Sequence, residues 1–176
     1  MKDETIRDVD TPAQGLASTI GKIAWAMKDG ALSPGDLAEL RRLDVEKPDQ
    51  PAFWRIRAEL LSGEREPDAE AENRWAVVLS NMARMAPLHH VPGRSVGRVL
   101  AEAGFAEGRL NRLLRSRGPG FRDALRRACA YLSARGEPLD WTELAALILT
   151  RDEEKTESLR RKIARDYFAQ LKRKET

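Results

Sequence analysis

The sequence of 176 residues contains one cysteine and two histidines, so the side chains that most often bind transition metals are scarce. A single thiol, Cys129, cannot form an internal disulfide or a thiolate cluster, which favours a reducing compartment such as the cytoplasm. His89 and His90 stand together before Val-Pro-Gly, with no carboxylate or further histidine at metal-ligand spacing. The sequence therefore predicts no metal ion and no cofactor.

Long apolar runs are absent as well. The longest uninterrupted run extends from Leu144 to Leu149, whereas a helix that crosses a bilayer needs ~20 apolar residues. The first ten residues, MKDETIRDVD, lack the apolar centre of an export signal. We expect a soluble, cytoplasmic protein without a membrane segment.

Motifs of common enzyme classes are also missing. The patterns GxxxxGK[ST], HExxH and GxSxG do not occur. Asp152, Glu153, Glu154 and Glu157 open a predicted helix, where the helix dipole favours negative charge. Cys129 shares an apolar helical stripe with its neighbours, as a small core residue does. The sequence predicts that the chain is not an enzyme.

Apolar residues recur at helical spacing throughout, and no segment alternates in the manner of a β-strand. This pattern predicts an all-α fold of about nine helices in two packed bundles. Ser33 followed by Pro34, and Ser95, are typical helix starts, and Gly104 and Gly118 are typical breaks. The predicted helices cover residues 12–28, 34–42, 51–61, 74–86, 96–103, 106–116, 119–133, 141–150 and 152–172, and residues 63–72 form an acidic linker.

Four tryptophans are candidates for the core. Trp54, Trp75 and Trp141 lie within apolar stretches and are interpreted as core residues. Trp25 falls on the side of its helix opposite Ile20 and its apolar neighbours. We predict that Trp25 is buried between the two bundles, with a position at an interface as the alternative.

The charge of the chain divides it into two parts. Residues 1–90 carry 12 basic and 16 acidic side chains, and residues 91–176 carry 19 basic and 12 acidic side chains. This asymmetry predicts an acidic N-terminal bundle over residues 1–90 and a basic C-terminal bundle over residues 91–176. A localised positive field attracts polyanions, so nucleic acid is the first partner to consider.

Arginine accounts for the strongest concentration of charge. Residues 109–127 contain seven arginines and one acid, Asp123. At 100° per residue, Arg109, Arg112 and Arg115 share one side of a helix, and the leucines of that helix take the other side. Since guanidinium presents a planar fork suited to phosphate, we interpret the arginine side as a phosphate-binding surface. A solvated charged face is the alternative.

Residues 96–117 also fit a helix-turn-helix motif with Gly104 at the turn, which would place the arginine helix in a major groove. Leu100 stands where the close approach of two such helices calls for a small residue. A stand-alone DNA-binding regulator therefore remains an alternative function. A helical adaptor whose arginines meet an acidic protein is another.

Several stretches together resemble a known family. They are DLAELRRLD, PAFWRI, LHHVPGRS, GRSVGRVLAEAGFAEGRLNRLLRSRG, LRRACAYL, PLDWTELAALIL and RRKIARDYF, in this order. The chain resembles the CasB family, the small subunit of the type I-E CRISPR complex Cascade. The resemblance implies a non-enzymatic helical subunit, present in two copies beside guide RNA and other Cascade subunits. It also implies contact with the target and displaced DNA strands and a role in steadying the R-loop.

The acidic N-terminal half departs from a uniformly basic binder, which suggests that this half packs on protein or on a second copy and that the basic half faces nucleic acid. The arginines of the matching motifs are the candidate nucleic-acid contacts. They are Arg41, Arg42, Arg94, Arg98, Arg109, Arg112, Arg115, Arg117, Arg122 and Arg126.

Overall fold

The computed structural model of the chain describes residues 13–61, 68–88 and 90–175, and these residues form helices without any strand. This confirms the all-α prediction. The helices are α1 (Ala13–Lys28), α2 (Pro34–Arg41), α3 (Pro51–Leu60), α4 (Ala69–Met85), α5 (Val96–Glu102), α6 (Glu107–Arg115), α7 (Gly118–Ala134), α8 (Trp141–Leu149) and α9 (Glu153–Glu175). None of these described helices is both long and apolar enough to cross a membrane.

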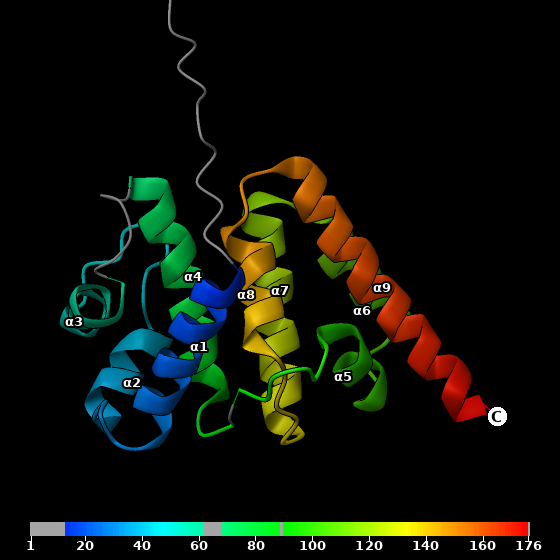
Figure 1. Cartoon of the computed structure of the whole chain (residues 1–176), viewed down its shortest axis with the longest axis horizontal. Coiled ribbons are helices and arrows are strands. Elements are labelled where there is room, and N and C mark those ends of the chain that lie inside the picture. The colour runs from blue at the N-terminus through cyan, green and yellow to red at the C-terminus, as the bar shows by residue number, and fades with distance from the viewer. Residues whose placement is uncertain (1–12, 62–67, 89, 176) are drawn as a thin grey trace, which may run out of the picture.

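The helices form two groups that meet at α7 and α8. In Figure 1, α1 to α4 lie on one side, α5, α6 and α9 lie on the other, and α7 and α8 stand between them. Helix α4 packs against both α7 and α8, and α1 packs against α8. The buried apolar side chains of both groups belong to one continuous core. The division into separate units at residue 90 stays a prediction.

Local capping signals define two of the helix starts as predicted. The Ser33 hydroxyl accepts the Asp36 N–H at 3.1 Å, and the Asp36 carboxylate accepts the Ser33 N–H at 2.9 Å. Pro34 follows at the first helical position of α2. The Ser95 hydroxyl accepts the Arg98 N–H at the start of α5. Each of these side chains satisfies a backbone donor that the helix itself leaves unpaired.

The predicted linker over residues 63–72 is wrong in its second part, because α4 already begins at Ala69. Residues 63–67 of that linker lie outside the described residues. The Asp68 carboxylate accepts the Ala71 N–H at 2.9 Å and so caps the helix. Glu70 and Glu72 then lie in the first turn, where the helix dipole stabilises negative charge. The acidic composition thus marks a helix start as well as a connection.

The tryptophan predictions have a mixed outcome. Trp75 and Trp141 are buried, as predicted, with 4% and 2% of their surface exposed. Trp54 is 43% exposed, so its assignment to the core is wrong. Helix α3 buries Phe53 and Ile56, and the 100° spacing of a helix places Trp54 on the opposite side. An apolar neighbourhood in sequence did not determine the direction of this side chain.

Trp25 is the most exposed large apolar side chain in the described part of the chain, at 61%. The prediction that it lies buried between the bundles is therefore wrong. Ile20 and Ile23 are fully buried on the other side of α1, so the core has no access to the Trp25 ring. The interface alternative for Trp25 stays a prediction.

Helix α5 approaches α9 so closely that the contact requires a glycine. A Cβ atom added at Gly97 would lie 2.1 Å from the carbonyl oxygen of Ile163 and 2.9 Å from the backbone nitrogen of Tyr167. Both atoms belong to the backbone of α9, which cannot move aside as a flexible side chain can. The absence of a side chain at Gly97 therefore sets the distance between the two helices.

Both ends of α5 are tied to neighbouring helices. At its start, the Glu143 carboxylate of α8 accepts the Val96 N–H at 2.6 Å and also binds the Lys162 ammonium of α9. Partial burial lowers the pKa of Lys162, but hydrogen bonds to Glu143 and Asp166 outweigh that effect and raise it overall. At the other end, the Lys174 ammonium donates to the Ala101 carbonyl at 2.8 Å.

We expect Gly97→Ala to lower the free energy of unfolding by about 1–3 kcal/mol, the usual cost of overpacking a tight contact. The matched control is Gly108→Ala in α6, where an added Cβ meets no atom within 4 Å. This control should be neutral or stabilising by up to about 1 kcal/mol, because alanine is the better helix former. Urea denaturation of both variants measures the difference. Wild-type stability of Gly97→Ala would contradict the close approach of the helices.

Candidate nucleic-acid interface

Helix α6 has the two-sided character that the sequence predicts. Leu110 and Leu113 are buried at 0% and 1% exposure, whereas Arg109, Arg112 and Arg115 are exposed. The helix packs against α7 and α9 and lies behind α9 in Figure 1. The apolar side holds α6 on the protein, and the arginine side faces outward.

The turn between α5 and α6 is held by Tyr131 of α7 and by Arg135, which directly follows this helix. The Tyr131 hydroxyl lies 3.0 Å from the Ala103 carbonyl and 2.9 Å from the Gly104 carbonyl. The Arg135 guanidinium stacks over the Tyr131 ring at 3.7 Å and donates to the Ala103 carbonyl at 3.0 Å. Gly104 has a φ of +74°, which favours glycine at this turn. These contacts fix the direction in which α6 leaves the turn.

Arg112 and Arg115 point into solvent without a compensating group. Within the described residues, neither side chain has a hydrogen bond or an ion pair. The Arg109 guanidinium lies over the Tyr131 ring, whose centroid is 5.8 Å away. Three successive guanidinium groups on one helix side are therefore available to an outside anion.

Three further predicted arginines lie on or next to α7 and are paired with carboxylates. Arg117 donates to the Ser116 carbonyl at 3.1 Å and pairs with Glu157 at 3.4 Å. Arg122 pairs with Glu46, and Arg126 pairs with Asp123 at 3.1 Å. Exposed pairs of this kind contribute only about 0–1 kcal/mol each. A phosphate could displace these partners at small cost.

Arg41 and Arg94 are partly buried, and their guanidinium groups donate hydrogen bonds to the backbone of segments distant in the sequence. The Arg41 Nε donates to the Ala83 carbonyl at 2.8 Å, near the end of α4. Arg94 donates to the Pro138 carbonyl at 3.0 Å and pairs with Glu137. These contacts link distant parts of the fold. They leave fewer guanidinium N–H donors available to a ligand.

The two remaining predicted arginines are exposed, and each binds a group four residues away in the sequence. Arg98 pairs with Glu102 at 2.7 Å, and Arg42 donates to the Ala38 carbonyl at 3.3 Å. The hydrogen bond from Arg98 is the main cause that lowers the pKa of Glu102. The structure thus brings Arg109, Arg112 and Arg115 together as cations without a carboxylate partner in the described part of the chain, and it does not add Arg41 or Arg42 to that group.

Arg160, a buried arginine of α9, was not among the residues predicted from the sequence. It is only 6% exposed, donates to the Ser116 carbonyl at 3.3 Å and lies 5.6 Å from the centroid of the Phe121 ring. Burial is the main cause that lowers its pKa, and nearby Arg117 adds to the effect. Arg160 precedes Ile163 by three residues on the buried side of the helix, and this spacing could have revealed it. It fixes α9 against the junction of α6 and α7.

A family model described as CRISPR-associated protein Cse2 matches residues 36–168. The chain belongs to this family. The resemblance to CasB proposed from the sequence is thereby confirmed. The matched region includes every candidate arginine on α5, α6 and α7.

Two solved structures share the fold of this Cse2-family chain. The crystal structure of CasB from Thermobifida fusca has a TM-score of 0.68 and 16% identity, covering 87% of this chain and 97% of that one. A chain of E. coli Cascade bound to a PAM-containing double-stranded DNA target has a TM-score of 0.62 and 23% identity, covering 91% and 96% respectively. Among curated protein sequences, none matches this chain significantly.

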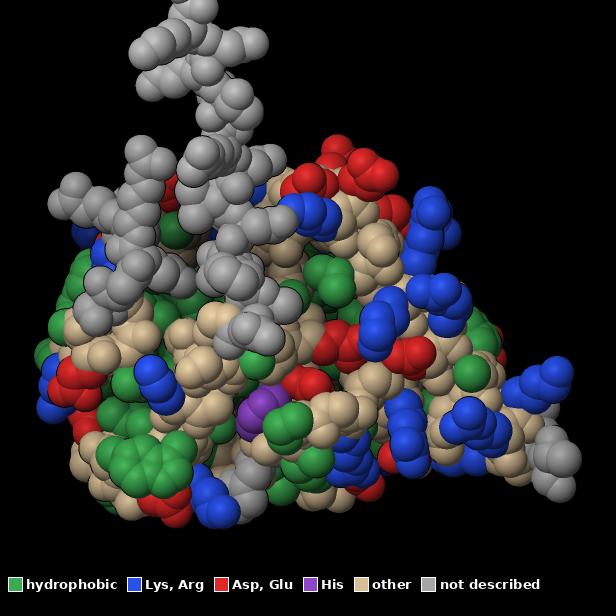
Figure 2. Space-filling view, viewed as in Figure 1, with side chains coloured by type: hydrophobic (Ala, Val, Ile, Leu, Met, Phe, Trp, Pro, Cys, Tyr) green, Lys and Arg blue, Asp and Glu red, His purple; other side chains and the backbone are tan. Residues whose placement is uncertain are grey.

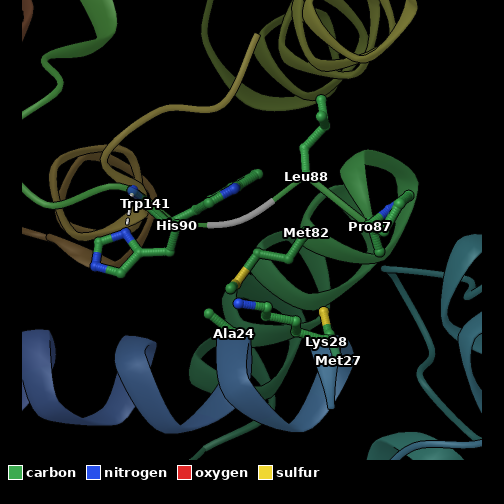
Figure 3. Close-up of a pocket in the computed structure, with 9 residues that line it drawn as sticks. Ala24, Met27, Lys28, Met82, Pro87, Leu88, His90 and Trp141 are labelled. Atoms are coloured by element: carbon green, nitrogen blue, oxygen red, sulfur yellow. Dashed lines mark hydrogen bonds between the residues drawn. The ribbon is translucent and has the colours of Figure 1, made fainter. Parts of the chain in front are cut away.

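The histidine pair, for which the sequence predicts no metal ion, has one member that contacts the backbone of α8. Figure 3 shows the His90 ring beside the start of α8, where its Nδ1 accepts the Trp141 N–H at 3.0 Å. The small cavity next to it, of about 10 Å³, has room for about one water molecule. His89 lies outside the described residues. Within the described chain, no group of three His, Cys, Asp or Glu residues is placed to hold a metal ion.

Cys129 is a core residue, as predicted. Its side chain is 1% exposed, and burial raises the pKa of its thiol to about 12. A thiol with such a pKa stays protonated at neutral pH and is a poor nucleophile.

The contact of His90 makes stability depend on pH. Burial lowers the pKa of His90 below its ordinary value of 6.5, although Asp140 opposes this effect. The unfolded chain therefore takes up a proton at a higher pH than the folded chain does. His90→Asn keeps an acceptor oxygen for the Trp141 N–H but does not titrate.

We expect the wild-type protein to lose stability relative to His90→Asn as the pH falls below about 6.5. The loss amounts to at most about 1.4 kcal/mol per pH unit and ends below the pKa of folded His90. Urea denaturation of both proteins between about pH 5 and pH 8 measures it. Parallel stability curves would show that protonation of His90 does not oppose folding.

Proposed function

We propose that this chain is the small subunit of a type I-E Cascade complex, where it contacts nucleic-acid backbone without sequence preference and stabilises the R-loop. Membership of the Cse2 family supports this role, as does a fold shared with a chain of DNA-bound E. coli Cascade. The observation that carries the proposal is the row of exposed arginines on α6. Arg112 and Arg115 have no carboxylate partner within the described residues.

The chemistry of the arginines suits this task. Guanidinium groups donate two parallel hydrogen bonds to phosphate, and phosphate is the same at every base. In RNA-guided complexes, base pairing reads the sequence, and protein contacts with the backbone tip a nearly balanced strand exchange. A rigid helix that presents Arg109, Arg112 and Arg115 in fixed directions would stabilise the opened strands in this way.

The remaining candidate arginines differ in how readily they can bind phosphate. Arg117, Arg122 and Arg126 follow the α6 arginines in the sequence and can exchange their carboxylate partners for phosphate. Arg41 and Arg94 act mainly through the loops and helix ends that they hold. The interface therefore centres on α6.

We further propose that the other Cascade subunits, guide RNA and a second copy of the chain are the partners of this cytoplasmic protein. The acidic half, residues 1–90, carries two exposed tryptophans, Trp25 and Trp54. Tryptophan is enriched in protein interfaces, and net negative charge disfavours nucleic acid. This half therefore suits contacts with protein.

We expect Arg112→Ala combined with Arg115→Ala to weaken nucleic-acid binding roughly 3- to 30-fold. The variant loses two exposed ion pairs between arginine and phosphate, each of which contributes up to about 1 kcal/mol. The slope of log affinity against log salt should fall by about 1 for each phosphate that the variant no longer binds. Thermal melting should not change, because neither side chain holds a partner in the described fold. Fluorescence anisotropy with single strands and duplexes of unrelated sequence gives both the affinity and the salt slope.

The matched control is Lys22→Ala combined with Lys28→Ala on α1, which removes the same charge from the other half of the chain. Its binding should match the wild type. Equal losses in both variants would show that net charge, and not α6, attracts the ligand. A preference for one duplex by about 4 kcal/mol or more would instead support the helix-turn-helix regulator.

The proposal includes no catalysis, so purified protein should not cleave labelled DNA or RNA in the presence of Mg²⁺ or Mn²⁺. Phosphodiester cleavage needs clustered metal ligands or a positioned acid and base. His90 binds a backbone amide instead. Cleavage that co-purifies with the protein and is lost in His90→Asn would overturn this expectation.

A further inference from the structure

Helix α9 carries a second cationic surface that was not among the predicted sites. Arg161, Arg165, Phe168 and Lys172 are all exposed. At 100° per residue they lie within about 60° of one another, on the side of the helix opposite Ile163. They extend over roughly 16 Å at 1.5 Å per residue. We call these four residues the α9 strip.

The charges along α9 are ordered. Glu153 and Glu154 lie in its first turn, and Lys172, Arg173 and Lys174 lie in its last turn. Figure 2 shows the same order, with carboxylates over the start of α9 and Lys and Arg side chains along the rest. The helix dipole explains cations in the last turn. It does not explain Arg161 and Arg165 in the middle of the helix.

The two arginines of the α9 strip have little local compensation. The Arg161 side chain is 77% exposed, and its ion pair with Glu157 is long, at 3.9 Å. Arg165 forms no side-chain hydrogen bond or ion pair within the described residues, although Asp166 follows it. The Asp166 carboxylate is bound to Lys162 at 3.0 Å, on another side of the helix. An anionic partner would therefore find both guanidinium groups accessible.

Phe168 gives the α9 strip an aromatic face among these cations. Its ring is 46% exposed and contacts Tyr167 edge to face, with the ring centroids 5.2 Å apart. Tyr167 is buried, and its hydroxyl donates to the Phe105 carbonyl. The exposed ring thus sits on a rigid helix beside an anchored neighbour, which preorganises it.

We propose that the α9 strip binds single-stranded nucleic acid, with an unpaired base stacked on Phe168 and phosphates on Arg161 and Arg165. Cationic surfaces with interleaved aromatic rings are typical of single-strand binding without sequence preference. A duplex keeps its bases stacked inside and offers Phe168 no ring. The strip is long enough for roughly five nucleotides at 3.4 Å each. This inference rests on the proposed function, since it names the strand type that a second surface prefers.

The test compares a labelled single strand and the matching duplex on the full chain by fluorescence anisotropy. Phe168→Leu keeps an apolar side chain but removes the ring, and it should weaken single-strand binding roughly 5- to 100-fold. Duplex binding should stay unchanged. Phe168→Trp should retain single-strand affinity and add fluorescence that the bound strand quenches. Trp54→Ala removes a similarly exposed aromatic from α3 and should bind as the wild type does.

The possible results separate this inference from the proposed function. If Arg112→Ala with Arg115→Ala weakens binding while Phe168→Leu binds single strands normally, the α9 strip is wrong and the α6 interface stands. Equal losses for single strand and duplex in Phe168→Leu would overturn stacking. Poly-glutamate that competes in a Phe168-dependent manner would show that the occupant is an acidic protein, and would also overturn it.

Discussion

The contact between α5 and α9 at Gly97 determines how the C-terminal half is built. Because the backbone of α9 fills the space that a side chain at Gly97 would need, the two helices lie at a fixed and short distance. Glu143 and Lys174 hold the two ends of α5 in the same position. Helix α6 follows after a short turn, so its orientation depends on this contact. The arginine surface is thus placed by a residue that carries no side chain.

The arginines of this Cse2-family chain have two different roles: some stabilise the fold, and others are available to a ligand. Arg41 and Arg94 donate to carbonyls that no helix hydrogen bond uses, and Arg160 lies buried against an aromatic ring. Such contacts satisfy backbone acceptors that would be costly to leave unpaired. Arg112 and Arg115 have no such partners in the described structure. Composition alone cannot separate structural arginines from those that are available to a ligand.

Local sequence was enough to predict where most of the helices lie, although α4 begins earlier than predicted. Ser33 with Pro34 starts α2, and the spacing of Leu110 and Leu113 gives α6 its buried side. These features depend on residues three or four positions apart, which a helix brings together without help from the rest of the chain. The family resemblance likewise rests on the order of such motifs. The all-α fold and the two-sided α6 were therefore available from the sequence.

The tertiary structure alone decided which side chains bind partners within the protein and which remain available to a ligand. The partner of Arg41 is 42 residues away and the partner of Arg122 is 76 residues away, so neither contact leaves a local signal. Trp54 is exposed because the core meets the other side of α3, although its sequence neighbours are apolar. Gly97 is required only because α9 packs against it. Periodicity specifies the sides of a helix, but the packing of distant segments determines what each side meets.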